Sequence, residues 1–152
     1  MNPILRGAAA GAAGTTALNV VTYLDMAIRG RPASDTPERS VEKVAELVGV
    51  GIPGEGATRE NRLSGLGPLT GLLTGVAMGM AYGAWDATVG RPRTLGGPLL
   101  AGLGAMLVAN GPMTAMGLTD PRTWSRTDWL SDVLPHLAYG WVTSSTYAAT
   151  GD

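Results

Sequence analysis

Charged residues are absent from four long stretches of this chain. No Asp, Glu, Lys or Arg occurs within residues 7–24, 63–85, 94–119 and 133–151, which are 18, 23, 26 and 19 residues long. A soluble helix carries charges along one face, whereas about 20 apolar residues take a helix across about 30 Å of hydrocarbon. We therefore expect an all-α, four-helix transmembrane bundle in a single domain over 1–152, with spans near 4–28, 64–88, 95–118 and 130–149.

Two other interpretations of this pattern remain open. The first is a soluble helical bundle rich in Ala and Gly, although none of the four stretches carries the charged face that a soluble helix needs. The second is a cleaved signal peptide at residues 7–24. Against it, no small-x-small cleavage site follows the apolar core, and Arg29 and Arg31 are typical of the flank of a retained span.

Lys and Arg are divided unevenly between the two ends of the predicted spans. The N-terminal tail and the second connection hold three, Arg6, Arg91 and Arg93. The first and third connections hold eight, Arg29, Arg31, Arg39, Lys43, Arg59, Arg62, Arg122 and Arg126. Because cytoplasmic connections are enriched in these residues, we expect a multi-pass protein of the inner membrane with both termini on the non-cytoplasmic side.

The first connection carries the signals of a short amphipathic helix near residues 36–49. Thr36 suits the N-cap, Pro37 the first helical position, and Gly49 the end of the helix. Apolar residues recur at one helical face, at Val41, Val44, Ala45 and Val48. Such a helix either lies on the membrane surface or a partner, or caps the cytoplasmic mouth of the bundle.

The second span carries glycine at every fourth position. Gly71, Gly75, Gly79 and Gly83 form a ridge of small residues along one side of the predicted helix. In lipid, small residues let two backbones approach closely, so we expect this ridge to pack against another helix, in the same chain or in a second copy.

Polar residues fall at similar depths in the four spans. Counted from the predicted cytoplasmic boundary, four side chains lie within about one helical turn of one another, Asn19, Thr74, Asn110 and His136. Asp132 precedes His136 by four residues and shares its helix face, and Asp25 lies at the boundary. In another interpretation, Asp132 instead caps the fourth span and 127–131 lie at the interface.

This polar layer has two possible roles. An imidazole can carry a proton at physiological pH, so His136 and Asp132 could relay protons or line a path for a small solute. Alternatively, the pair forms a satisfied hydrogen bond between helices, with Asn110 or Asn19. One imidazole and a few carboxylates do not require a metal, and we expect neither a metal nor another cofactor.

Composition and motifs exclude several classes of function. The chain has no Cys and a net charge of −1, which excludes thiolate metal sites and disfavours binding to nucleic acid. It contains no Walker A motif, no Gly-x-Ser-x-Gly and no His-Glu-x-x-His. We therefore do not expect an enzyme.

Residues 10–45 carry a resemblance to known proteins. The chain has ten Arg and one Lys, and Gly30-Arg31-Pro32-Ala33-Ser34 is followed by Thr36-Pro37-Glu38 and Val41-Glu42-Lys43. In this it resembles small, functionally unassigned integral membrane proteins of actinobacteria, which are distantly similar to the YagU-like inner-membrane proteins. The resemblance implies four spans and brings no catalytic residues.

These observations lead to two main functional hypotheses, beside a third, a membrane-embedded enzyme that acts on lipid substrates. The first is a non-enzymatic accessory or stress-linked component of the inner membrane, with the lipid bilayer, a second copy or a larger membrane complex as its partner. The alternative is a carrier that conducts protons or a small solute along the polar layer.

Overall fold

The computed structural model describes residues 2–90 and 95–151, and this part of the chain is all α. It contains five α-helices, one short 3₁₀ turn and no strand. The helices are α1 (Pro3–Arg29), α2 (Thr36–Leu47), α3 (Gly56–Val89), α4 (Gly96–Ala115) and α5 (Arg126–Ala149), with the 3₁₀ turn η1 (Pro121–Thr123) before α5. The predicted fold class is confirmed as far as its helical content. Arg91 and Arg93, which the predicted orientation uses, lie outside the described residues.

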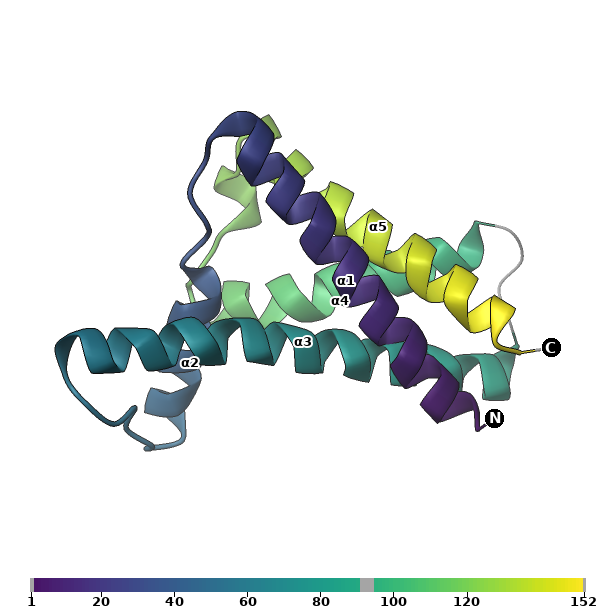
Figure 1. Cartoon of the computed structure of the whole chain (residues 1–152), viewed down its shortest axis with the longest axis horizontal. Helices are drawn as coiled ribbons and strands as arrows, with labels where there is room; N and C mark the ends of the chain where they lie inside the picture. Colours follow the sequence, from purple (N-terminus) through teal and green to yellow (C-terminus); the bar gives the residue numbers. More distant parts are fainter. Residues whose placement is uncertain (1, 91–94, 152) are drawn as a thin grey trace.

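The helix α1 lies at the centre of the arrangement. It packs against both α3 and α5, α5 also packs against α4, and α3 touches α4 only slightly. Figure 1 shows α1 crossing α3 near the end that holds both termini and then diverging from it toward the other end. The connections on either side of α2 and around η1 lie at that other end.

Capping residues fix where the helices begin and end. The Asn2 side chain accepts a hydrogen bond from the backbone N–H of Ile4 at 2.8 Å, and Gly30, at φ +63°, ends α1 in the left-handed region. Ser125 and Asp128 form a reciprocal capping box at the start of α5. Because α5 therefore begins at Arg126, the interpretation in which Asp132 caps this helix is wrong.

The helix α2 packs on the N-terminal part of α3. Glu42 pairs with Arg59 at 2.5 Å, and the turn at Pro37 sits directly over Gly67. Thr36 is the first helical residue and not the N-cap, which is Asp35, while Gly49, at φ +70°, follows the end of the helix as expected. The helix thus covers part of α3, but Val44 and Leu47 within it remain exposed, as does the C-cap residue Val48.

The interior of the protein is made of small and aromatic residues. The buried hydrophobic cluster consists of Ala10, Tyr82, Ala101, Ala105, Tyr139 and Tyr147, with Leu18 and Met78 packed against it. Most of the large aliphatic side chains instead lie outside, although Leu63 is buried. Exposed leucines occur along α3, α4 and α5, and Leu107 is 72% exposed.

Two of the described helices are long and apolar enough to cross a membrane. In α3 and α4 the most apolar stretch has a mean hydropathy of 1.3 and 1.2, and only 17% of each stretch is buried inside the protein. The other two predicted spans, α1 and α5, do not reach this level, because α1 is rich in Ala, Gly and Thr and α5 carries Asp132, His136 and several hydroxyl groups.

Candidate functional site

Three residues of the predicted polar layer meet between α4 and α5. The side-chain amide nitrogen of Asn110 donates to the Asp132 carboxylate at 2.8 Å. His136 Nδ1 lies 2.7 Å from the Asp132 backbone carbonyl and 3.7 Å from its carboxylate, and the two side chains are 12% and 22% exposed. Because a carbonyl oxygen only accepts, the shorter contact places the proton on Nδ1. This is the satisfied interhelical arrangement with Asn110 considered from the sequence.

The other two members of the layer do not join this cluster. Asn19 on α1 and Thr74 on α3 are half-buried, and no side-chain hydrogen bond links either one to Asn110, Asp132 or His136 in the described structure. Residue counting from a common boundary gives the depth of a side chain but not the direction in which it leaves its helix.

Asp25 belongs to a separate set of contacts at the C-terminal end of α1. Its carboxylate accepts from the Arg31 Nε at 2.6 Å and from the Arg29 guanidinium. Arg29 also donates to the Ser131 hydroxyl, so this set ties the end of α1 to the first turns of α5.

The glycine ridge of α3 faces α1 along three of its four positions. A Cβ at Gly79 would overlap the backbone of Gly7 and Gly11, one at Gly75 would overlap the Thr15 hydroxyl, and one at Gly83 would overlap the Pro3 carbonyl. At the fourth position no other helix in the described part of the chain packs against the ridge. Gly71 has no atom within 4 Å of an added Cβ, because α1 has diverged from α3 at that level.

Two tyrosines that the sequence analysis did not single out link α5 to α3. The Tyr139 hydroxyl donates to the Gly75 carbonyl at 2.7 Å, and the Tyr147 hydroxyl donates to the Gly83 carbonyl at 3.4 Å. Both pairs are separated by 64 residues, so α3 and α5 run parallel in constant register. Tyr139 and Tyr147 are eight residues apart, as are Gly75 and Gly83. This equal spacing is the signal in the sequence that could have revealed the pairing.

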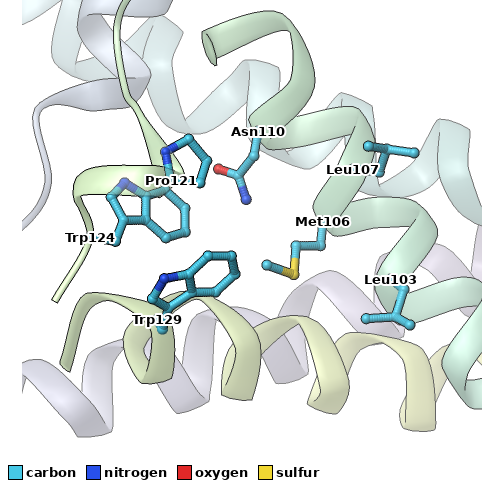
Figure 2. A pocket seen from close by; sticks show the side chains of 7 residues that line it. All are labelled: Leu103, Met106, Leu107, Asn110, Pro121, Trp124 and Trp129. Atoms are coloured by element: carbon cyan, nitrogen blue, oxygen red, sulfur yellow. The ribbon is translucent and has the colours of Figure 1, made fainter. Parts of the chain in front are cut away.

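A pocket of about 180 Å³ opens beside Asn110. Met106 and two leucines of α4 line one side, and Pro121, Trp124 and Trp129 line the other (Figure 2). The two indole rings meet edge to face, with centroids 5.0 Å apart and planes at 65°, and Trp124 Nε1 donates to the Thr119 hydroxyl at 2.8 Å. The pocket is therefore apolar, with Asn110 as its polar side chain.

No metal site is evident within residues 2–90 and 95–151, where no three Asp, Glu or His side chains are grouped to hold an ion. The candidate site therefore consists of the Asn110–Asp132–His136 cluster and the neighbouring apolar pocket. No protein family, curated protein or solved structure matches this chain.

Proposed function

We propose that this chain is a small multi-pass protein of the inner membrane that serves as a non-enzymatic accessory component, with lipid around its four long helices. The observation that carries the proposal is the distribution of side-chain size. Ala, Gly, Thr and Tyr fill the helix contacts, while most Leu, Ile and Val side chains point outward, with Ile28 81% exposed and Leu107 72% exposed.

This distribution suits lipid better than water. A soluble protein of this length buries its large aliphatic residues to drive folding, and an exposed apolar surface of this extent would cause aggregation. In a bilayer, helices associate through close backbone packing and hydrogen bonds between helices. The contact of Gly79 with Gly7 and Gly11 supplies the first, and the Tyr139–Gly75 hydrogen bond supplies the second.

The helix lengths and topology support four crossings. The 20 residues of α4 extend about 30 Å, and the 34 residues of α3 extend about 50 Å, so the charged first turns of α3 would stand outside the hydrocarbon. Both termini lie at one end of the molecule (Figure 1), as an even number of crossings requires. In the proposed orientation this end faces away from the cytoplasm.

Membrane extraction and labelling test the embedding and its orientation. The protein should remain in the pellet after alkaline carbonate treatment, and release into the aqueous fraction would refute the proposal. Because the chain has no Cys, single Ser34→Cys and Thr150→Cys variants report the two ends. In intact spheroplasts an impermeant maleimide should label Thr150→Cys and spare Ser34→Cys. The reverse pattern would invert the orientation.

The accessory role is tested by purification from native membranes. α2 leaves Val44, Leu47 and Val48 exposed, and α3 and α4 pack only slightly on each other, so both regions offer contact surface. A persistent oligomer or a stoichiometric partner is expected after mild detergent extraction and crosslinking. A lone monomer under both conditions would argue against this role.

The contiguous Asn110–Asp132–His136 cluster supports a second candidate, a proton or small-solute carrier. Proteoliposomes loaded with a pH-sensitive dye would then show flux that falls in His136→Ala and Asp132→Asn. Our first proposal expects no flux from the wild-type protein. Wild-type flux that both variants abolish would refute the accessory role and support the carrier.

A further inference from the structure

The pocket beside Asn110 opens on the surface that the proposed function assigns to lipid. Two of its lining residues, Leu103 and Leu107, are 50% and 72% exposed, so its α4 wall continues into the outer apolar face of that helix. The opposite wall is formed by the connection before α5, which folds back along α4 and brings Pro121 and Trp124 against it (Figure 2). A hydrocarbon chain can therefore enter sideways from the bilayer without crossing a polar barrier.

The Asn110 side chain gives the pocket a hydrogen-bond acceptor with a fixed orientation. The Asn110 amide nitrogen is engaged by Asp132, which leaves its carbonyl oxygen as the free end of the side chain. This oxygen points toward Pro121 and Trp124, inside the ring of lining residues (Figure 2), and has no hydrogen-bond partner among the described residues. A ligand that pairs with it must carry a hydrogen-bond donor.

The two tryptophans stand where such a ligand changes from apolar to polar. Trp rings concentrate at the level where the hydrocarbon meets the headgroups, because they combine a large apolar body with one N–H. The edge-to-face pair of Trp124 and Trp129 closes the pocket at the connection, while Leu103 and Met106 line its deeper part. The pocket thus changes from an aliphatic surface to an aromatic surface beside the Asn110 oxygen. A ligand with an acyl chain followed by a hydroxyl group would match both parts.

We propose that this pocket binds a single-chain glycerolipid, with its acyl chain along Leu103, Met106 and Leu107 and a glycerol hydroxyl donating to the Asn110 side-chain oxygen. The inference rests on the proposed membrane embedding and adds a specific ligand to it. A volume of about 180 Å³ suits part of one acyl chain.

Quenching of tryptophan fluorescence by brominated lipid tests this proposal. Trp85 and Trp141 lie outside the pocket, so a Trp85→Tyr/Trp141→Tyr protein reports on Trp124 and Trp129 alone. It is reconstituted in phosphatidylcholine vesicles that contain increasing fractions of dibromostearoyl glycerol. Occupancy of the pocket should give quenching that saturates at a low fraction of this lipid, in excess of the gradual quenching from collisions in the bilayer.

Matched variants distinguish quenching by lipid bound in the pocket from quenching by lipid in the surrounding bilayer. Met106→Phe fills the pocket and should remove the saturable part, and Leu103→Phe provides a second filling variant if the first does not fold. Met80→Phe makes the same change at an exposed methionine of α3 and should quench as the parent does. Equal curves for Met106→Phe, Leu103→Phe and Met80→Phe would overturn the proposal.

The hydroxyl contact is tested on the unaltered pocket. Methyl dibromostearate has the same chain and lacks the hydroxyl, so its half-saturating fraction should be about twofold to tenfold higher. Equal half-saturation for the two probes would overturn the assigned role of Asn110. These outcomes are distinct from failure of the embedding itself, which would appear earlier as release of the protein by carbonate.

Discussion

The guanidinium of Arg6 donates to the backbone carbonyl of Tyr147 at 2.7 Å, although 141 residues separate them. The same guanidinium lies 4.3 Å from the centre of the Tyr147 ring, and its Nε is buried without a hydrogen-bond partner among the described residues. Arg6 thereby joins the first turns of α1 to the last turns of α5. It closes the end of the molecule that contains both termini.

Arg6→Met should loosen this end of the molecule. The substitution keeps an unbranched apolar stem but removes the guanidinium, and with it the hydrogen bond from a charged donor and the cation–π contact, so we expect a loss of about 2 kcal/mol in the free energy of unfolding. Unfolding in mixed micelles with increasing dodecyl sulfate, followed by circular dichroism, measures this loss. Arg39→Met, at a more exposed arginine, is the control. Equal losses for the two variants would contradict the assigned role.

The contact between α1 and α3 should depend on Gly79 far more than on Gly71. A Cβ at Gly79 would overlap the backbone of Gly7, which cannot move without separating the helices, so Gly79→Ala should cost about 1–3 kcal/mol. Gly71→Ala adds the same methyl group in open space and should be neutral or stabilise α3 by up to about 1 kcal/mol. The same unfolding assay compares them, and a loss at Gly71 as large as at Gly79 would refute this packing.

The spacing of charges predicted where the four long helices lie, since each charge-free run coincides with one helix over most of its length, although the predicted span 95–118 continues three residues past the end of α4 at Ala115. The predicted spans 4–28 and 130–149 lie within α1 and α5, which extend beyond them by four residues at most. Helix α3 starts eight residues before the predicted span 64–88. Its first two turns carry Arg59, Glu60 and Arg62, because charged residues end a charge-free run without ending a helix.

The candidate site was predictable only in part, because the depth of a residue along its helix does not determine the direction in which its side chain points. Counting residues placed Asn110 and His136 at one level, and α4 and α5 do bring them to the same residue, Asp132. The same counting gave Asn19 the same depth, but α1 directs its small residues to α3 and α5 and leaves Asn19 without a contact to the cluster. The rotation of a helix about its axis depends on which of its glycines pack against a neighbour, and it can be predicted only when the partner helix is known.

The capping box at the start of α5 should make stability depend on pH. The Ser125 hydroxyl, and then its backbone N–H, hold the pKa of Asp128 below its usual value. Ionised Asp128 therefore stabilises the folded chain above about pH 4, the pKa of an unfolded aspartate, and this stabilisation is lost as the pH falls through the lower folded pKa. The difference in melting temperature between wild type and Asp128→Ala should be constant above pH 5 and shrink below pH 4.

Ser125→Ala provides the control for this pH dependence. Without the serine hydroxyl, the folded pKa of Asp128 moves back toward its usual value, so Asp128→Ala should add little pH dependence in that background. Melting curves of the four proteins at pH 3, 4, 5 and 6 complete the comparison. A difference between wild type and Asp128→Ala that persists unchanged at pH 3 would show that the charge of Asp128 does not act through the cap.

The docking of α2 on α3 should depend on the absence of a side chain at Gly67. A Cβ at this position would lie 3.1 Å from both the Glu38 backbone nitrogen and the Pro37 Cβ, so a leucine there must push α2 away. A helix of 12 residues is marginal on its own in water, and once displaced it should unfold. Gly67→Leu should therefore expose Lys43, within α2, to rapid cleavage by trypsin.

Gly65→Leu is the matched control, since an added Cβ at Gly65 meets nothing within 4 Å. Because Pro68 restricts the backbone of the residue before it once that residue has a Cβ, both variants are made in a Pro68→Ala background. Mass spectrometry of the fragments then gives the rate of cleavage after Lys43. This rate should rise several-fold in Gly67→Leu and stay at the parent value in Gly65→Leu. Equal rates in both would mean that α2 is held by its Glu42–Arg59 ion pair and not by its fit to the α3 surface.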